Sequence, residues 1–254
     1  MLGEKTKSIE VYEGFVELID TLGTDLDIAN AARVSFKGFS QSLGEKDIKL
    51  MKYLWMHQHT SPFRMVTCKF RVKAPIFVLR QWMKHSVGCT WNEVSARYVE
   101  VEESAFKPTT WRLQHKTSKQ SSFGEVDLDI AEQAHAKLLE SYEIAFKNYH
   151  GMLEQGICRE QARVQLPVGM YSECIWKADL QAVLHFLALR LDEHAQAEIR
   201  EFAQAILRLV KLSFPITTQL FLISQEVDQK VASEKLKAWE SIATQLSYNS
   251  TLGE

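Results

Sequence analysis

The sequence lacks the features that mark secreted or membrane-spanning proteins. Its four cysteines, Cys68, Cys89, Cys158 and Cys174, lie far apart and have neither zinc-site spacing nor the pattern of a disulfide framework. No apolar stretch approaches the ~20 residues needed to cross a bilayer, and no charged start leads into an apolar run. These absences argue against a disulfide scaffold and a membrane protein. They predict a cytoplasmic protein, of a cell or of a virus-infected cell.

A strong charge of one sign is also missing. The 30 Lys and Arg residues nearly balance the 32 Asp and Glu residues, so no nucleic-acid partner is expected and any anion site must be local. The chain has no internal repeat and no segment typical of a linker. We therefore expect one domain over residues 1–254, a length at which roughly 70% of the unfolded surface is buried.

Periodicity predicts the first elements. A helix is expected over 45–58, ending before His59 because Pro62 disfavours helical geometry at the residue before it. Its apolar residues at helical spacing are Ile48, Met51 and either Leu54 or Trp55. Apolar and polar residues then alternate as in a strand with one buried face. The apolar set is Val66, Cys68, Phe70 and Val72. A second helix is expected over about Pro75–Ser86, with the proline in its first turn.

Farther along, helical patterns dominate. A stripe of a long helix is formed by Ala131, Ala134, Leu138, Tyr142, Ala145 and Tyr149. A short helix over Arg159–Val164, a strand over 170–177 and helices over 180–191 and 194–212 follow. The two last helices have apolar faces formed by Leu180, Val183 and Leu187, and by Ala195, Ile199, Phe202 and Ile206. Irregular segments are expected at 38–44, at 118–124 and from 247 onward. Long helices with few strands indicate a mixed α/β domain.

Polar and aromatic side chains crowd the segment from residue 80 to residue 98. The polar ones are Arg80, Gln81, Lys84, His85, Asn92, Glu93, Ser95 and Arg97. Trp82, Trp91 and Tyr98 are interleaved with them. This mixture suits a flat, polar, phosphorylated ligand, although a surface loop held by its own hydrogen bonds would account for the pattern equally well.

Three short motifs in this segment resemble the signature of the flavin-dependent thymidylate synthase (ThyX) family. They are Arg80-Gln81-Trp82, Lys84-His85-Ser86 and Asn92-Glu93-Val94-Ser95-Ala96-Arg97-Tyr98. In that family an Arg-His-Arg triplet precedes Asn-Glu-x-Ser-x-Arg-Tyr. Further ordered matches cover most of the chain: Ala31–Ser35, His59–Phe63, Lys73–Phe77, Trp111-Arg112, Ala162-Arg163, Leu166-Pro167, His185–Leu187, Leu189-Arg190, Ala195-Gln196 and Glu198-Ile199.

The resemblance implies a mixed α/β fold of the α+β type, with a central, largely antiparallel sheet flanked by long helices. It implies a homotetramer whose active sites are shared between subunits. The implied reaction converts dUMP to dTMP with methylenetetrahydrofolate as one-carbon donor, FAD as cofactor, NADPH as reductant and no metal. No cysteine nucleophile is needed in this chemistry, although Cys89 is the one rival nucleophile in the segment.

Residue roles are implied by the same resemblance. Arg190 corresponds to the arginine that holds the uracil ring and favours its deprotonated form, for which a planar, permanently charged guanidinium is suited. The expected nucleotide-binding residues are Gln81, Glu93, Ser95, Ala96, Arg97, Arg163 and Arg190. The expected flavin-binding residues are His59, Thr60, Lys84, His85, Ser86, Glu93, Asp179, Gln181 and His185. Any one of these histidines, taken alone, is more often structural.

The match fails at several positions on the flavin side. Lys84-His85-Ser86 has lost both arginine forks of the triplet, and the spacer to Ser95 is one residue longer than usual, which Gly88 could absorb with a positive φ. Asp179 and Gln181 replace an Asn-x-Arg pair, and Arg64 replaces an acid. We expect Arg64 to pair with Asp179 or with the FAD diphosphate.

Alternatives follow for single residues and for the whole chain. Arg163 and Arg190 could be solvated or paired with acidic residues on their helices, such as Glu160, Glu193 or Glu198. The chain could instead be a related pyrimidine-nucleotide enzyme, for instance one that hydroxymethylates, or a nucleotide-binding homologue without catalysis.

Overall fold

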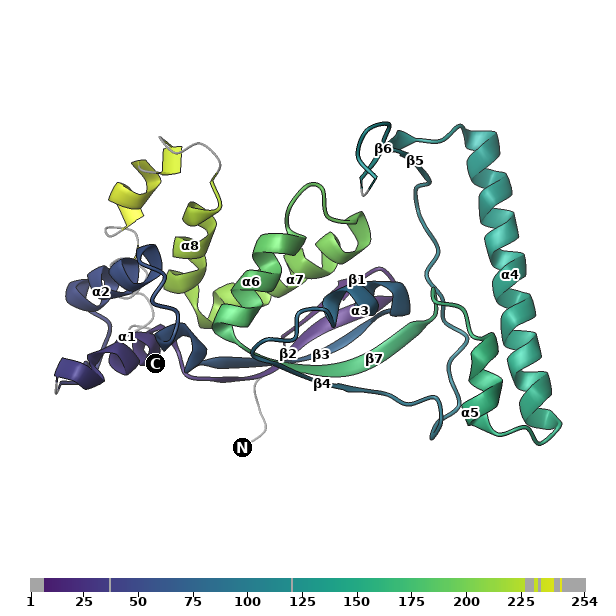
Figure 1. Cartoon of the computed structure of the whole chain (residues 1–254), viewed down its shortest axis with the longest axis horizontal. Helices are drawn as coiled ribbons and strands as arrows, with labels where there is room; N and C mark the ends of the chain where they lie inside the picture. Colours follow the sequence, from purple (N-terminus) through teal and green to yellow (C-terminus); the bar gives the residue numbers. More distant parts are fainter. Residues whose placement is uncertain are drawn as a thin grey trace.

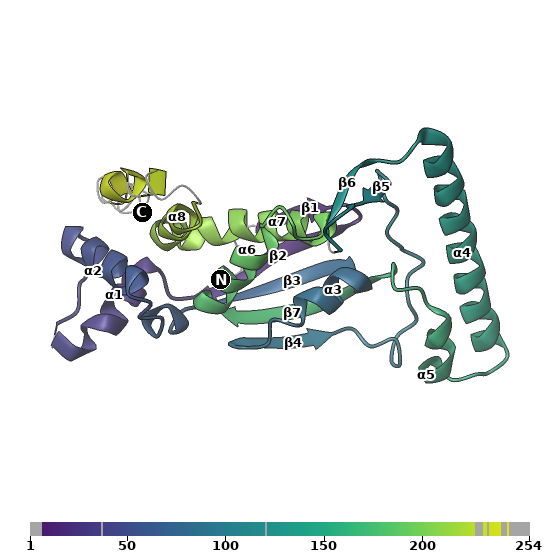
Figure 2. The ribbon, with the colours of Figure 1, turned by 45° about the horizontal axis from the view of Figure 1, so that its top comes forward.

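The architecture is a five-stranded antiparallel sheet with helices packed on one face, as the ribbon shows from two directions (Figures 1 and 2). This computed structural model describes residues 7–36, 38–119, 121–226, 231–232, 234–239 and 243. The elements of the sheet are β1 (Lys7–Val11), β2 (Gly14–Leu22), β3 (Thr67–Pro75), β4 (Cys89–Glu93) and β7 (Tyr171–Asp179). The helices are α1 (Asp25–Arg33), α2 (Glu45–Met56), α3 (Ile76–Trp82), α4 (Leu128–Glu154), α5 (Arg159–Ala162), α6 (Leu180–Arg190), α7 (Ala197–Ser213) and α8 (Pro215–Ser224). The sequence expectation of a mixed α/β fold with an antiparallel sheet is confirmed.

The sheet has the order β1-β2-β3-β7-β4, so that β3 and β7 occupy its centre and β4 lies at one edge. The predicted alternation in β3 is confirmed, because Val66, Cys68, Phe70 and Val72 are all buried. The opposite face is charged: Arg71 on β3 donates to Glu173 on β7 at 2.6 Å. One apolar and one charged face explain why helices cover only one side.

Helices α3, α6 and α7 cover the apolar face through an aromatic core. Trp82 stacks on Phe186 of α6 with ring centroids 4.7 Å apart and meets Trp176 of β7 edge-on at 5.2 Å. All three rings are fully buried. Burial of such large rings stabilises the fold, and their contacts hold α3 and α6 side by side above β7.

The predicted helix over about Pro75–Ser86 begins within one residue of its expected start but ends four residues early. Pro75 is the last residue of β3 and caps α3, which begins at Ile76 and ends at Trp82. Beyond it, the Lys84 N–H donates to Gln81 and the His85 N–H to Trp82, which makes a tight turn. Lys84-His85-Ser86 therefore lies in a turn that leads into β4, rather than on a helix.

The other expected elements agree with the structure apart from local shifts. Helices α2, α4, α5 and α6 and strand β7 occur where periodicity placed them, whereas α7 begins at Ala197, so that Ala195 lies outside it. The segment 118–124 is not wholly irregular, because β6 (Ser122–Glu125) pairs with β5 (Arg112–Gln114) in a two-stranded hairpin. Residues 38–44 have no regular structure, and the tail from 247 lies outside the described residues.

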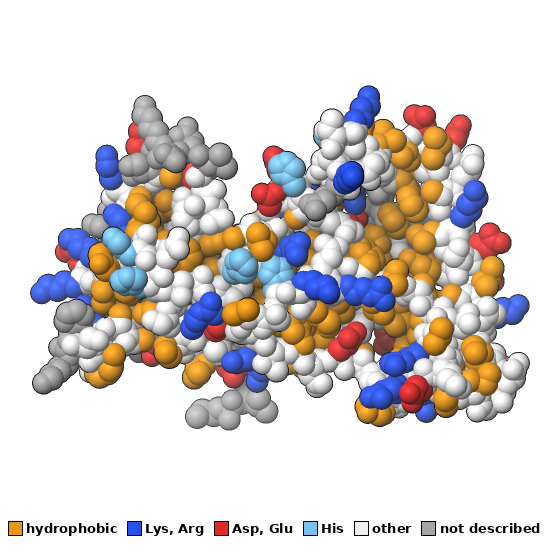
Figure 3. Space-filling model, viewed as in Figure 1, with side chains coloured by type: hydrophobic (Ala, Val, Ile, Leu, Met, Phe, Trp, Pro, Cys, Tyr) orange, Lys and Arg blue, Asp and Glu red, His pale blue; other side chains and the backbone are white. Residues whose placement is uncertain are grey.

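Helix α4 stands away from the sheet at one end of the molecule (Figure 1). Its 27 residues make it about 40 Å long at 1.5 Å per residue. Phe146 and Tyr149, both in its C-terminal half, are its only buried residues, whereas the predicted stripe from Ala131 to Ala145 is half-buried. Four large apolar side chains of α4 are exposed: Leu128, Ile130, Leu139 and Ile144. Figure 3 shows apolar surface along this part of the molecule.

Candidate functional site

The first cavity, here called the Arg163 cavity, has a volume of about 880 Å³ and opens beside the C-terminal end of β4. Strand β4 pairs with β7 along its length, and this pairing places Glu93 at the cavity and releases the chain into the loop that follows. Arg163 approaches from a short 3-10 turn, Arg163–Gln165, immediately after α5. The predicted residues that line this cavity are Glu93, Ser95, Ala96, Arg97 and Arg163. Arg80 lines it as well.

Guanidinium groups in the Arg163 cavity are available for an anion. In the part of the chain that the structure describes, neither Arg80 nor Arg163 forms an ion pair with a carboxylate, which excludes the alternative pairing of Arg163 with Glu160. Arg97 donates to the hydroxyl of its neighbour Tyr98 at 3.1 Å and lies over that ring. Arginine forks of this kind suit a phosphate, which accepts paired N–H donors.

The second cavity, the Arg190 cavity, has a volume of about 500 Å³ and lies between the turn after α3 and one face of α6. Gln181, His185 and Leu189 follow one another at intervals of four along α6, so their side chains share that face. The predicted residues that line this cavity are Lys84, His85, Ser86, Gln181, His185 and Arg190. Arg64 lines it too. Figure 3 shows histidines and cationic side chains gathered over α6 and α3.

Arg190 and His85 are joined by a hydrogen bond in which the Arg190 Nε donates to His85 Nε2 at 3.1 Å. Burial, followed by the nearby Arg190 and His185, lowers the pKa of His85 to about 4. His85 is therefore neutral at neutral pH, and because its Nε2 accepts, its proton lies on Nδ1. The bond fixes the guanidinium, and its terminal N–H groups donate to no side chain among the described residues, so they are available to a ligand. Arg190 thus pairs with neither Glu193 nor Glu198.

Behind this cavity, Arg64 pairs with Asp179 at 3.0 Å, which is one of the two partners expected for it. The other Asp179 oxygen accepts from the Ala182 N–H at 2.7 Å and so caps α6. Gly88 has the positive φ expected from the longer spacer, +73°. A Cβ atom there would lie 2.2 Å from the Asp179 carboxylate. The spacer, the cap of α6 and Arg64 are therefore packed into one junction.

The third cavity, the His59 cavity, has a volume of about 390 Å³ and is lined by the predicted residues His59, Thr60 and Gln181. Gln181 thus forms a wall common to this cavity and the Arg190 cavity. Its Oε1 atom is buried and accepts no hydrogen bond from any described residue. An orphaned acceptor between two cavities fits a ligand that offers a donor.

The predicted residues do not form one cluster within a single chain. Arg163 and Arg97 lie in one cavity and Arg190 in another, while Gln81 lines none of the three. The sequence analysis missed Ser224 and Gln225, which line the His59 cavity from the end of α8. No local motif marks them, because their position depends on how α8 packs against α2.

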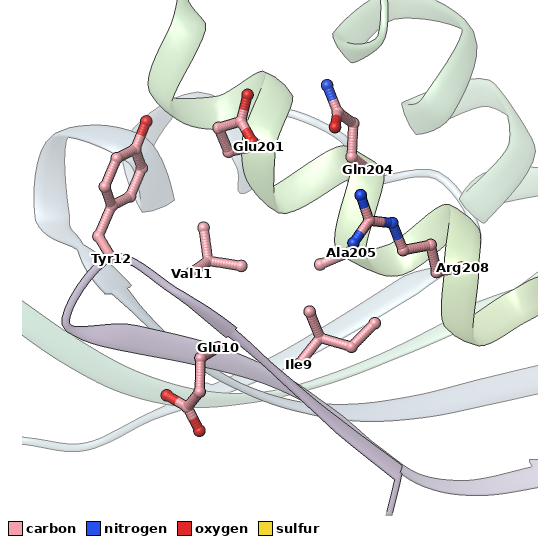
Figure 4. A pocket seen from close by; sticks show the side chains of 8 residues that line it. All are labelled: Ile9, Glu10, Val11, Tyr12, Glu201, Gln204, Ala205 and Arg208. Carbon is pink, nitrogen blue, oxygen red and sulfur yellow. The ribbon is translucent and has the colours of Figure 1, made fainter.

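A fourth cavity in the described part of the chain is lined by none of the predicted site residues. This cavity of about 160 Å³ between β1 and α7, the Tyr12 cavity, is lined by residues such as Tyr12, Glu201 and Arg208 (Figure 4). Within the described ranges, no cluster of three or more His, Cys, Asp or Glu side chains is arranged to hold a metal. Nor is any helix in those ranges long and apolar enough to span a bilayer.

Comparison with known proteins places these residues in a family. The family model described as Thymidylate synthase complementing protein matches residues 17–216. A flavin-dependent thymidylate synthase of Thermus thermophilus is 44% identical over 209 residues, which cover 82% of this chain and 76% of that protein. One from Kosmotoga olearia is 38% identical over 84% of this chain and 93% of its own length.

Solved structures agree. The crystal structure of a UMP/dUMP methylase PolB from Streptomyces cacaoi bound with 5-Br UMP has a TM-score of 0.74 and 32% identity, covering 83% of this chain and 94% of that chain. The same methylase bound with 5-Br dUMP has a TM-score of 0.75.

Proposed function

Because the chain belongs to the flavin-dependent thymidylate synthase (ThyX) family, we propose that it converts dUMP to dTMP. Methylenetetrahydrofolate would donate the one-carbon unit, and NADPH would supply reducing equivalents through FAD. The family identifies a methyltransferase-type enzyme that uses a flavin. The chemistry of the cavities supports the nucleotide and the flavin, whereas the folate and NADPH follow from membership of the family.

The observation that carries the proposal is the set of guanidinium groups in the Arg163 cavity that form no ion pair with a carboxylate of the described residues. Arg97 and Arg163, with the Ser95 hydroxyl and the backbone around Ala96, offer the donors that a nucleotide phosphate requires. Glu93 accepts from the Ser172 hydroxyl at 2.7 Å, which holds its carboxylate in place at the wall, where it suits a ribose hydroxyl.

Arg190 is suited to the uracil ring. Its Nε donates to neutral His85, which holds the guanidinium in place. The remaining N–H groups can then donate to a ligand, and the positive charge lies beside it. A guanidinium held in advance stabilises negative charge that develops on a pyrimidine ring as C5 becomes nucleophilic. A partly desolvated environment strengthens this effect, and burial lowers the pKa of Arg190 itself.

The residues of the Arg190 and His59 cavities fit FAD. The buried Gln181 acceptor requires a donor, and Lys84 adds a positive charge suited to a diphosphate. We assign the contacts to His59, Thr60, Lys84, His85, Ser86, Gln181 and His185. Asp179 is assigned a supporting role and no direct contact, because both of its carboxylate oxygens already accept hydrogen bonds, one from Arg64 and one from the Ala182 N–H. When bound, the flavin supplies the redox chemistry of the reaction.

A homotetramer is part of the proposal. Arg163 and Arg190 line separate cavities of one chain, which supports a site that a second copy completes around the nucleotide. The uncovered α4 is the surface available for that copy, because Leu128, Ile130, Leu139 and Ile144 are exposed on it. Light scattering should give four chains, and a stable, active species of 29.2 kDa would refute the shared site.

Kinetics of two alanine variants test the assigned roles. Arg190→Ala should lower the single-turnover rate of methylene transfer by ~100-fold or more, because the lost interaction is strongest in the transition state. Arg163→Ala should mainly raise the apparent KM for dUMP. Arg208→Ala, in the Tyr12 cavity, is the matched control and should change neither. Equal, purely KM-type defects in the first two variants would remove the activation role from Arg190.

A second activity is favoured by the similarity to a UMP/dUMP methylase. Turnover of UMP and dUMP in parallel, with the product identified by mass, separates a thymidylate synthase from a methylase that also accepts the ribonucleotide. A product heavier by a hydroxymethyl group would instead identify a hydroxymethylating enzyme. A colourless protein that binds dUMP without turnover would be a homologue without catalysis.

A further inference from the structure

We propose that Glu198 and Gln196 are positioning residues that fix the orientation of the Gln81 side-chain amide, on the stretch of chain between the Arg163 and Arg190 cavities, for contact with the nucleotide. Gln81 is one of the nucleotide-binding residues expected from the family resemblance, so the inference rests on the proposed function. Neither Glu198 nor Gln196 lines any of the three cavities assigned to ligands. Each acts through another side chain.

The four side chains form a continuous series of hydrogen bonds across three elements. Arg112, on β5, donates to Glu198 Oε1 at 2.7 Å. Gln196, just before α7, donates through Nε2 to Glu198 Oε2 at 2.8 Å. Gln81, on α3, donates through Nε2 to Gln196 Oε1. Glu198 lies in the first turn of α7 and is only 5% exposed, so water does not compete for its oxygens.

The direction of every bond follows from the carboxylate. A carboxylate paired with an arginine only accepts, so Gln196 must turn its NH2 group toward Glu198. Its carbonyl oxygen then faces Gln81, and Gln81 in turn must present its own NH2 group. The carbonyl oxygen of Gln81 and one N–H therefore stay available for a ligand. Without Glu198 as the obligate acceptor, both amides could reverse.

The position of Gln81 makes this orientation matter. Arg80, its neighbour on α3, lines the Arg163 cavity, whereas Lys84 and His85 in the next turn line the Arg190 cavity. Gln81 thus lies on the stretch of chain that joins the two cavities. Because the series begins at Arg112, the docking of the β5–β6 hairpin onto α7 also determines how Gln81 is held.

The decisive variants first remove the acid at position 198 and then move it to position 196, where the amide was. Glu198→Gln alone removes the obligate acceptor, and the affinity of the holoenzyme for dUMP should fall by ~10-fold, about 1.4 kcal/mol. The double variant Q196E/E198Q restores a donor and an acceptor at each link, because the new carboxylate at 196 accepts from both neighbours. Its Kd for dUMP, measured by calorimetry, should return to within about threefold of the wild-type value.

A purely structural role of Glu198 predicts a different pattern. In that case E198Q and Q196E/E198Q would be equally impaired, since both place an amide opposite Arg112, and this result would overturn the proposal. Glu198→Gln could also fail to fold. Gln196→Leu interrupts the series without touching the Arg112–Glu198 pair, so wild-type dUMP affinity in a folded Q196L protein would overturn the proposal as well.

Two controls separate this inference from the proposed function. Glu45→Gln makes the same chemical change in an exposed pair with Lys49 and should leave the Kd unchanged; a loss as large as that of E198Q would reveal a general charge effect and overturn the assignment. If the wild-type holoenzyme binds no dUMP, the proposed function fails at that step. If it binds dUMP and the exchange does not rescue E198Q, only the positioning role fails.

Discussion

Replacing Gly88 with alanine should lower the free energy of unfolding. The size of the loss depends on the contacts of Asp179, which packs against Gly88. Gly88 has a φ of +73°, a conformation that costs an L-residue roughly 1–2 kcal/mol. The added methyl group would also lie 2.2 Å from Asp179 Oδ2, far inside van der Waals contact. The carboxylate must move, because the neighbouring backbone is fixed by the Asp179 N–H, which donates to the Gly88 carbonyl.

The cost of that movement can be worked out from the two bonds it breaks. The cap on Ala182 contributes about 1 kcal/mol. The pair with Arg64, whose side chain is 38% exposed, contributes about 0.5 kcal/mol. Alanine also reduces the entropy of the unfolded chain, which returns about 0.5 kcal/mol. Gly88→Ala should therefore lower the free energy of unfolding by about 2–3 kcal/mol.

Gly156→Ala is the matched control, since Gly156 has a φ of +82° and, apart from its chain neighbours, no described residue has an atom within 4 Å of the place its new methyl group would take. It should cost only the conformational part, about 1 kcal/mol after the entropy gain. Urea unfolding of both variants at one protein concentration measures the difference. Equal losses would show that the Asp179 junction is not rigid, and the steric account would then be wrong.

Four further substitutions test buried and half-buried groups. Thr217→Val removes the donor to buried Asp25 and should cost about 1–2 kcal/mol, whereas Thr218→Val, at a buried hydroxyl with no partner among the described residues, should be neutral or stabilising in urea unfolding. The pKa of His85 is about 4 when folded and ordinarily about 6.5, so its contribution to stability is present above pH 6.5 and is lost as pH falls to 4. His85→Gln should flatten the fall of Tm with decreasing pH in that window, and an unchanged slope would contradict the shift. Cys89→Ala should keep turnover within about twofold, because burial raises the pKa of this thiol and disfavours the thiolate; complete loss with intact folding would support covalent catalysis.

Local patterns predicted those features that depend on nearby residues. The alternation over β3, the helical spacing of α2 and the positive φ of Gly88 all follow from side chains within a few positions of each other. The pairing of Arg64 with Asp179 was one of two alternatives expected, because Arg64 replaces an acid of the family pattern and Asp179 replaces a neutral Asn. The periodic patterns of β3 and α2 are short-range and need no knowledge of the tertiary structure, whereas the Arg64–Asp179 pair, 115 positions apart, was expected only from the family pattern.

Features that depend on distant partners could not be predicted in the same way. Strand β4 forms because its backbone pairs with β7, about eighty positions later. This pairing requires the chain to leave helix α3 after Trp82. The hairpin of β5 and β6 lies in a segment whose composition is typical of a loop. The division of the site into separate cavities depends on packing as well, so a local motif identifies the residue types but not their grouping.

The support of α4 has a consequence for its hydrogen exchange. Only the C-terminal half of the helix is held by the core, through the buried Phe146 and Tyr149. The exposed Leu128 and Ile130 lie near its other end. In an isolated chain, amide protons near Leu128 should exchange fastest and protection should rise toward Tyr149. Contact with a second copy along the helix would flatten this gradient. The exchange profile of α4 would then measure how much subunit association lowers local opening of this helix.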